Sequence, residues 1–220
     1  MILFDIIEPM KHYFINNNSN KLLLFFTGWG CDEFCFKHLK SKSDIILFYD
    51  YRTLDFNFNF KNYDEINLLA YSAGVFIASI LNFDFKINKK IAVNGNPYLF
   101  DEHFGISKDK QNLLYNITLE TADDFLKNYL IKTEEEYKNF QPAQRTIESC
   151  KMEFNSLKKI YSTHKKFIKD IYDIVYIGEF DTIFNPEIQK EYYGSKVKMI
   201  KNASHNPFFK IKNFEDILTL

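Results

Sequence analysis

The sequence Ala70-Tyr71-Ser72-Ala73-Gly74 lies between two apolar runs, Ile66 to Ala70 and Val75 to Leu81. A short buried strand followed at once by a helix leaves room only for a sharp turn, with the serine at its apex. Such a turn holds the Ser72 hydroxyl above the edge of the sheet. It also directs the backbone N–H of Ala73, at the start of the helix, toward an oxygen bound beside it. The segment therefore predicts a nucleophile elbow.

The elbow pattern is one residue short of G-x-S-x-G, because Ala70 replaces the first glycine. Strand and helix pass close to each other at that position, and alanine is the smallest side chain that can take the place of glycine. A serine between small residues at a strand-helix junction is also a common helix N-cap. Taken alone, the elbow leaves both a catalytic and a capping role open for Ser72.

Length and composition favour one domain over residues 1–220, because 46% of the 220 residues are hydrophobic and can fill one substantial core. A net charge of −1 gives no general attraction to nucleic acid or to an anionic membrane. The N-terminus has no basic segment, and no apolar run approaches the roughly 18 residues that span a membrane. We therefore expect a cytoplasmic monomer without nucleic-acid or membrane partners.

The three cysteines, Cys31, Cys35 and Cys150, are odd in number and contain no C-x-x-C pair. This spacing argues against a disulfide framework and against a zinc site. Cys31 and Cys35 could share one face of a helix, but a metal ion would need two further ligands beside them. We expect neither a metal nor a cofactor.

Apolar runs alternate with helical patterns along most of the chain. The expected strands are 1–7, 11–16, 22–26, 45–49, 66–70, 91–93, 173–178 and 197–200, and helices are expected over 31–39, 75–82, from 186 onward and over 213–218. The first two strands form an antiparallel pair, and residues 53–63 form a loop or a weak edge strand. This alternation predicts an α/β fold with a mostly parallel central sheet and helices on both faces.

Residues 98–170 break that alternation, because they contain helical patterns over 111–118, 121–131, 133–140 and 146–172 but no β-rich run. A helical insertion at a strand end would cover the carboxyl ends of the strands, where ligands bind in such sheets. We therefore predict a helical cap over about 98–170. Residues 151–170 carry six lysines and two acidic residues, a net charge of +4, which is either a solvated face or a partner surface.

A serine hydroxyl needs an imidazole to accept its proton and a carboxylate to orient that imidazole. Only His205 among the five histidines follows a late strand, since the others precede the elbow or lie in the predicted cap. Asp181 follows the strand before it, whereas Asp173 precedes that strand and Glu179 is a weaker alternative. The chain order serine, aspartate, histidine, each behind a different strand, is that of an α/β-hydrolase triad.

Two other strand ends carry polar or glycine-rich segments. In Thr27-Gly28-Trp29-Gly30 the glycines allow the Trp29 backbone N–H to turn inward, although a plain glycine turn explains the same residues. Asp50 also follows a strand, but we expect it to pair with Arg52 or to make a turn.

Several segments resemble the BioG type of pimeloyl-[acyl-carrier protein] methyl ester esterase over nearly the whole chain. They are Thr27-Gly28-Trp29-Gly30, Asp50-Tyr51-Arg52, Asn94-Gly95-Asn96-Pro97-Tyr98, Phe104-Gly105-Ile106 and His205-Asn206-Pro207-Phe208. The third and fourth are more diagnostic than the triad, which many unrelated hydrolases share. The resemblance implies an α/β-hydrolase fold with Ser72 as nucleophile, Asp181 as acid and His205 as base. It also implies that Trp29 and Ala73 donate to the oxyanion.

The resemblance further implies hydrolysis of the methyl ester of pimeloyl-carrier protein in biotin precursor synthesis, through an acyl-enzyme. Acyl carrier proteins are acidic, so the +4 stretch becomes a candidate docking surface. The candidate docking residues are Lys158, Lys159, Lys165, Lys166 and Arg145. Two alternatives stay open: a general short-chain carboxylesterase or thioesterase that needs no carrier, and a non-catalytic binding protein with a hydrolase fold. The intact Ser72, Asp181 and His205 argue against the second.

Overall fold

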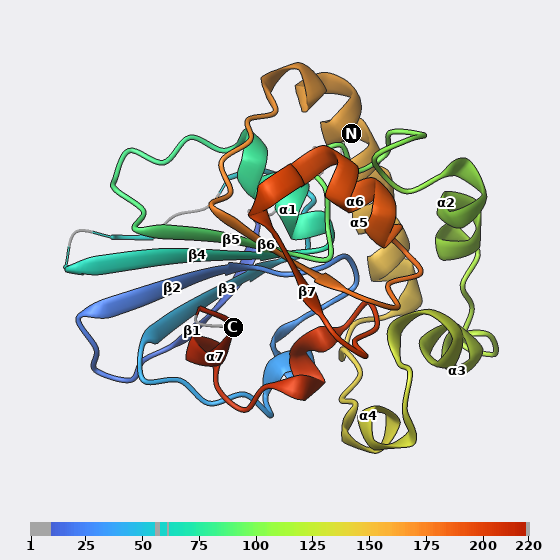
Figure 1. Ribbon diagram of the computed structural model, residues 1–220, viewed down its shortest axis with the longest axis horizontal. Helices are drawn as coiled ribbons and strands as arrows, with labels where there is room; N and C mark the ends of the chain where they lie inside the picture. Colours follow the sequence, from blue (N-terminus) through green and yellow to red (C-terminus); the bar gives the residue numbers. More distant parts are fainter. Residues whose placement is uncertain (1–9, 56–57, 61, 219–220) are drawn as a thin grey trace, which may run out of the picture.

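The computed structural model describes residues 10–55, 58–60 and 62–218. Seven strands of these residues form one sheet in the order β1-β3-β2-β4-β5-β6-β7 (Figure 1). They are β1 (Lys11–Ile15), β2 (Lys21–Phe26), β3 (Asp44–Tyr49), β4 (Glu65–Tyr71), β5 (Lys89–Val93), β6 (Ile174–Gly178) and β7 (Val197–Ile200). β1 pairs antiparallel with β3, and the other neighbouring strands pair in parallel. The predicted mostly parallel sheet is confirmed.

Helices occupy most of the connections between these strands. They are η1 (Glu33–Phe36), α1 (Ala73–Ile80), α2 (Lys108–Tyr115), α3 (Ala122–Phe125), η2 (Leu126–Leu130), α4 (Glu134–Asn139), α5 (Ile147–His164), η3 (Lys165–Phe167), α6 (Pro186–Tyr193), η4 (Gly194–Lys196), η5 (Pro207–Lys210) and α7 (Phe214–Ile217). η2 is a single π-helical turn, and the other η elements are 3₁₀ turns.

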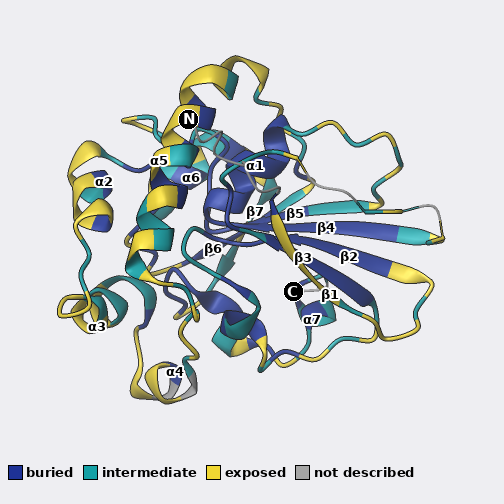
Figure 2. Cartoon of the chain, turned by 180° about the vertical axis from the view of Figure 1, so that it is seen from behind, coloured by how far each residue is buried: buried dark blue, intermediate teal, exposed yellow. Residues whose placement is uncertain are grey.

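The central strands are mostly buried (Figure 2), and their side chains belong to two cores, one on each face of the sheet. In β2, Leu22 and Leu24 belong to one core, while Leu23 and Phe25 belong to the other. Such a continuous apolar run is typical of a parallel strand that is covered on both sides. Helices α1, α5 and α6 cover the first face, and η1, η5 and α7 cover the second. Helices on both faces were predicted, and the structure has them.

The segment between β5 and β6 contains α2, α3, α4 and α5, and within residues 98–170 the structure has no strand. Figure 1 shows α2, α3 and α4 beyond the end of the sheet at which β4 leads into α1. These helices therefore lie at the carboxyl ends of the parallel strands. The division into one domain with a cap over about 98–170 stays a prediction. None of the described helices is long and apolar enough to cross a membrane.

The predicted helix over 31–39 is wrong in extent. Only the 3₁₀ turn η1 forms there, because Asp32 is extended, with φ of −145°, and its carboxylate accepts the backbone N–H of Phe34 as a cap. The same carboxylate accepts the backbone N–H of Gln144 at 2.7 Å, so a contact from the distant helical segment helps to set this start. Cys31 and Cys35 therefore do not share a face of an α-helix.

Three other expectations have different outcomes, and one of them differs in its end. The expected strand over 1–7 lies outside the described residues, and the described part of 53–63 contains no strand. The helix expected over 146–172 ends at His164, followed by η3. The backbone N–H of Lys169 then donates to the carbonyl of Ser79, so the chain leaves the helix to pass the end of α1.

Candidate active site

Ser72 occupies the sharp turn between β4 and α1. Its backbone has φ of +53° and ψ of −121°, a conformation that residues with side chains rarely adopt. The turn is tightly surrounded, because a Cβ on Gly74 would lie 2.2 Å from the carbonyl oxygen of Phe26. The strained backbone and the glycine contact are the features of the predicted elbow, and the serine side chain lines the cavity above the sheet.

Ser72, His205 and Asp181 form a continuous hydrogen-bonded chain. Ser72 Oγ lies 3.1 Å from His205 Nε2, and His205 Nδ1 lies 3.0 Å from each carboxylate oxygen of Asp181. A proton on Nδ1 is donated to the carboxylate, which leaves Nε2 free to accept the hydroxyl proton of Ser72. Ser72 follows β4, Asp181 follows β6 and His205 follows β7 along the chain, as predicted from the sequence.

The acid and the base are both held rigidly. Asp181 Oδ1 also accepts the backbone N–H groups of Ile183 at 2.8 Å and Phe184 at 3.1 Å. The imidazole of His205 lies between the rings of Tyr71 and Phe184, with ring centroids 5.3 Å and 6.0 Å away. Only 3% of His205 is exposed. Packing and hydrogen bonds therefore leave the imidazole little freedom to rotate.

Ser72 and His205 open onto an apolar cavity of about 230 Å³. Side chains from the segment between β5 and β6 line much of it, including Leu114, Ile117, Phe125, Leu126, Leu130 and Phe154. Lys151 is a basic residue in this lining, and its Nζ lies 5.7 Å from the centre of the Tyr115 ring. The cavity suits a linear hydrocarbon chain that ends at Ser72.

The loop after β2 runs beside the elbow. A Cβ on Gly28 would lie 3.2 Å from Ser72 Cβ, and Trp29 and Ala73 both line the cavity. Helix α5 anchors this loop, since Trp29 Nε1 donates to the carbonyl of Cys150 at 2.7 Å. The backbone N–H of Gly30 donates to Glu153 Oε2 at 3.1 Å. Trp29 and Ala73 therefore line the same cavity as Ser72, and their role as oxyanion donors stays a prediction.

Arg145 lies in a buried ion-pair network, which argues against the docking role predicted for it. Its side chain is 7% exposed, and its guanidinium contacts Asp50 Oδ1 at 2.9 Å and Glu153 Oε2 at 2.6 Å. The expected pair of Asp50 with Arg52 also forms, at 2.9 Å. The sequence reasoning missed Glu153, whose only signal was a carboxylate among the apolar positions of α5. Burial raises the pKa of Glu153, and Arg145 opposes that shift only in part.

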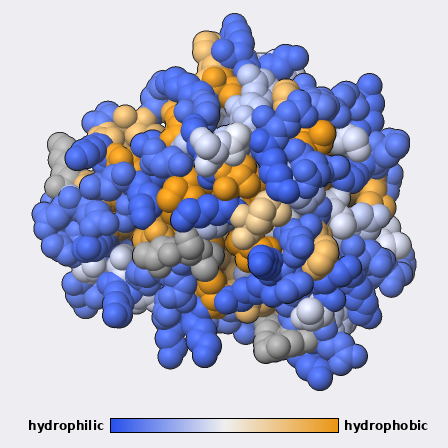
Figure 3. All heavy atoms as spheres, viewed as in Figure 1, coloured by the Kyte–Doolittle hydropathy of each residue, from blue (hydrophilic) through white to orange (hydrophobic). Residues whose placement is uncertain are grey.

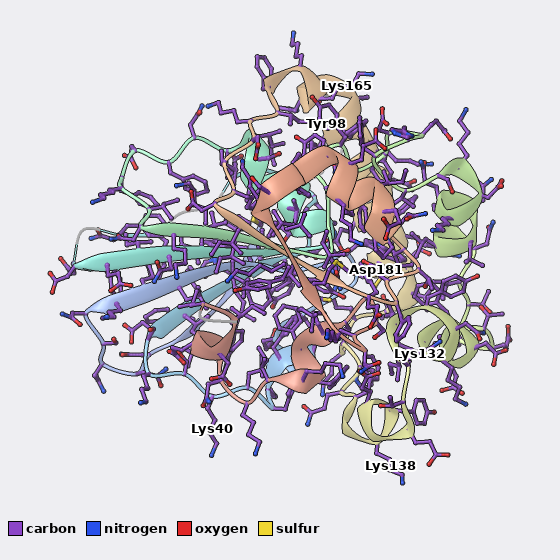
Figure 4. The ribbon with its side chains drawn as sticks, in the orientation of Figure 1. Lys40, Tyr98, Lys132, Lys138, Lys165 and Asp181 are labelled. Atoms are coloured by element: carbon purple, nitrogen blue, oxygen red, sulfur yellow. The ribbon has the colours of Figure 1, made fainter. Side chains whose placement is uncertain are left out.

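The other docking candidates are exposed. Lys158, Lys159, Lys165 and Lys166 all lie at the surface, and none of them forms an ion pair with another described residue. Lys158 follows Leu157, which lines the cavity. Lys165 lies eight residues beyond Leu157, about 12 Å further along the helix axis. Figure 4 places Lys165 at the opposite end of the molecule from Lys138 on α4, with Asp181 between them.

The three cysteines are free thiols. A hydrogen bond to Cys35 and burial raise the pKa of Cys31 well above its usual value, so this thiol is neutral at neutral pH. Among residues 10–55, 58–60 and 62–218, no group of three or more metal-ligating side chains is placed to hold a metal ion.

The fold and the site together define the class of α/β-hydrolases, in which an elbow serine is followed along the chain by its acid and its base. Solved structures share this fold. A lipase-esterase related protein from Clostridium acetobutylicum superposes with a TM-score of 0.59 at 16% identity, over 91% of this chain and 93% of that protein. An epoxide hydrolase from Bacillus megaterium gives 0.56 at 14% identity, over 91% of this chain and 93% of that protein.

A family model described as "Pimeloyl-ACP methyl esterase BioG" matches residues 10–217. The crystal structure of BioG from Haemophilus influenzae superposes with a TM-score of 0.81 at 25% identity, covering 94% of this chain and 99% of that one. The chain belongs to the BioG family of pimeloyl-ACP methyl esterases, a family of carboxylic ester hydrolases. The resemblance found in the sequence is confirmed.

Two curated relatives match most of this chain. An uncharacterized protein from Haemophilus influenzae is 28% identical over 196 residues, covering 84% of this chain and 87% of that protein. A malonyl-[acyl-carrier protein] O-methyltransferase from Bacteroides fragilis is 32% identical over 176 residues, covering 77% of this chain but 36% of the methyltransferase. The chain therefore spans about a third of the length of that relative.

Proposed function

We propose that this chain is a serine esterase that hydrolyses the methyl ester of pimeloyl-[acyl-carrier protein] in biotin precursor synthesis. Family membership supports the substrate class. The observation that carries the reaction type is the hydrogen-bonded chain from Ser72 through His205 to Asp181, beside an apolar cavity. The roles of these residues are those predicted from the sequence.

In the first half of the reaction, Ser72 Oγ attacks the ester carbonyl carbon while its proton passes to His205 Nε2. The tetrahedral intermediate collapses, the bond from carbon to the methoxy oxygen breaks, and His205 returns the proton to that oxygen. Methanol leaves, and the pimeloyl group is held on Ser72 as an ester. Asp181 stabilises the charged imidazole without taking its proton.

In the second half, a water molecule attacks the acyl-enzyme and gives a proton to His205. Collapse of this second intermediate breaks the bond to Ser72 Oγ, which regains the proton from His205. The product is a free carboxylate at the end of the carrier-linked chain. In both halves the backbone N–H groups of Trp29 and Ala73 donate to the negative oxygen, which lowers each barrier.

The lining of the cavity favours a substrate with a long acyl chain, such as the carrier-linked ester, over a small ester. Its apolar lining offers contacts along a seven-carbon chain, so binding energy from carbons remote from the ester can orient the reacting carbonyl. The exposed lysines of α5 supply a positive surface for an acidic carrier. A general carboxylesterase or thioesterase that needs no carrier is the competing function, because the triad alone serves either.

The deciding experiment compares the pimeloyl methyl ester bound to acyl carrier protein with a small methyl ester, using the same enzyme preparation. The proposed function predicts a higher kcat/KM for the carrier-linked ester. Release of methanol and of the free acid by mass spectrometry identifies the bond that breaks. Equal kcat/KM on both substrates would favour the general esterase, and cleavage at the thioester would favour a thioesterase.

A further inference from the structure

The turn after β5 lies where the segments carrying Ser72, Asp181 and His205 meet. Asn94 is the first residue of this turn, its side chain is fully buried, and its φ of +44° lies in the left-handed region. Few residues with side chains adopt that region, and asparagine is among those enriched there. A strained backbone at a buried polar residue beside a reactive site indicates that the surrounding structure requires this residue in this conformation.

The side chain of Asn94 bonds to the acid segment and to the base segment at once. Its Oδ1 accepts the backbone N–H of Gly178 at 2.7 Å. Its Nδ2 donates to the carbonyls of Ser204 at 3.0 Å and of His205 at 2.7 Å. Both amide hydrogens and the carbonyl oxygen therefore have partners. The Asn94 side chain therefore links the end of β6 to the segment that follows β7 in the chain.

Gly178 begins the turn that presents Asp181, whose backbone N–H donates to the Gly178 carbonyl at 3.1 Å. The base segment presses against this turn, because a Cβ on Gly178 would lie 2.4 Å from the carbonyl oxygen of Ser204. The spacing between the two segments is therefore small and depends on the groups that hold them. Asn94 bonds to one residue of the acid turn and two of the base segment.

The main chain beside Asn94 also reaches the nucleophile. The backbone N–H of Ser72 donates to the carbonyl of Val93 at 3.0 Å. On the other side of Asn94, a Cβ on Gly95 would lie 2.5 Å from the carbonyl oxygen of Ser72. The turn from Val93 to Gly95 therefore contacts the segments that carry all three members of the hydrogen-bonded chain.

We propose that Asn94 is a positioning residue, whose three side-chain hydrogen bonds set the alignment of Asp181 and His205 with Ser72. This inference rests on the proposed function, because that alignment matters only if the three residues react as a triad. Asparagine suits the position since it accepts once and donates twice at this length, whereas a carboxylate offers no donor to the two carbonyls. It also tolerates the left-handed backbone.

Asn96 provides a matched control two residues further along the same turn. It is also fully buried, and its side chain bonds to Gln189 at 3.2 Å and to the backbone N–H of Tyr98 at 2.9 Å. Among the described residues its side chain has no hydrogen bond to the acid or base segment. Asn96→Ala therefore reports what losing a buried asparagine does to stability alone.

The test compares Asn94→Gly, Asn94→Ala and Asn96→Ala with the parent enzyme on a small soluble ester, below the melting temperature of each. Asn94→Gly keeps a residue that accepts positive φ but removes the three hydrogen bonds, so it separates the two properties of Asn94. We expect Asn94→Gly and Asn94→Ala each to lose about 100-fold in kcat with little change in KM. Labelling of Ser72 by a phosphonate probe should slow in parallel, while Asn96→Ala keeps its kcat.

Wild-type kcat in Asn94→Gly would overturn the inference, since it would show that only the backbone conformation matters. An equal loss of kcat in Asn96→Ala would also overturn it, because stability alone would then explain both. If Asn94→Gly does not fold, Asn94→Ser keeps one donor and should fall between the parent and the expected 100-fold loss; full activity there would count against the inference. Retained activity in Ser72→Ala would instead overturn the proposed function, and the inference with it.

Discussion

At the scale of single residues, the proposed nucleophile is a side chain that supports no packing. Ser72 Oγ has a hydrogen bond to His205 and faces the cavity, so Ser72→Ala removes one oxygen from the site and nothing from the core. We expect kcat to fall by about five to six orders of magnitude, the usual cost of losing a triad nucleophile. Thermal unfolding should stay close to that of the parent. Residual activity above a few per cent would show that another group attacks the ester.

Arg145 is the residue for which burial changes the expected role. Its guanidinium is paired with both Asp50 and Glu153, so its removal leaves the buried Glu153 carboxylate without a cation and takes one cation from Asp50, which keeps Arg52. We expect Arg145→Met to destabilise the fold by about 3 to 5 kcal/mol in urea unfolding. The matched variant Lys158→Met, on an exposed lysine, should change stability little. A stable Arg145→Met enzyme that had lost only its carrier-linked activity would restore the docking role.

At the scale of elements, α5 connects the segment between β5 and β6 to the loop beside the elbow. Glu153 on this helix is fully buried and accepts backbone N–H groups of Gly30 and Tyr51, both at 3.1 Å. Burial raises the pKa of Glu153 above its usual value of 4.5, so the folded protein holds this proton more tightly than the unfolded chain does. Its contribution to stability is therefore complete below pH 4.5 and is lost as pH rises through the folded pKa.

Glu153→Gln should remove this dependence on pH. The variant should be less stable overall, because the glutamine NH₂ group faces the N–H donors that bond to Glu153 in the parent. Its free energy of unfolding should nevertheless fall less than that of the parent as pH rises above 4.5. Urea unfolding at a series of pH values measures the difference. Glu148→Gln, an exposed change on the same helix, should follow the parent curve. Parallel curves for all three proteins would mean that Glu153 is not the group responsible.

At the scale of the whole molecule, residues 151–170 carry a net charge of +4 in a chain whose net charge is −1. The face seen in Figure 3 is largely hydrophilic, with apolar residues reaching the surface in broken patches across its middle. Lys158 and Lys159 follow the part of α5 that lines the cavity, whereas Lys165 and Lys166 lie beyond its end. A carrier that delivers its acyl chain to this cavity should therefore depend more on the first pair than on the second.

Reversal of Lys158 and Lys159 to glutamate should raise KM for the carrier-linked ester and leave hydrolysis of a small ester unchanged. Reversal of Lys165 and Lys166 should have a smaller effect. Both effects should shrink as salt exceeds about 0.15 M, where the screening length is about 8 Å. Equal losses of activity on both substrates would indicate damage to the helix. No loss of activity on either substrate would show that these lysines are solvent-exposed residues without a docking role.

Local features of the sequence were enough to predict the sheet, the elbow, and Ser72, Asp181 and His205 as candidates. Buried parallel strands need continuous apolar runs, and an elbow needs small residues, so both leave a pattern within a few residues. The same holds for α6, whose start at Pro186 was predicted because proline suits a first helical position.

The tertiary structure alone decided where several polar side chains lie. Arg145 pairs with Asp50 across 95 positions of sequence, and Asn94 bonds to His205 across 111. Beyond the end of α5, Lys169 bonds to the carbonyl of Ser79, and the Asp32 carboxylate that caps η1 also accepts the backbone N–H of Gln144. Such partners meet only when the chain is folded, and a lone arginine or asparagine has the same local pattern whether it is buried or exposed. Burial and pairing of these residues are therefore properties of the assembled fold.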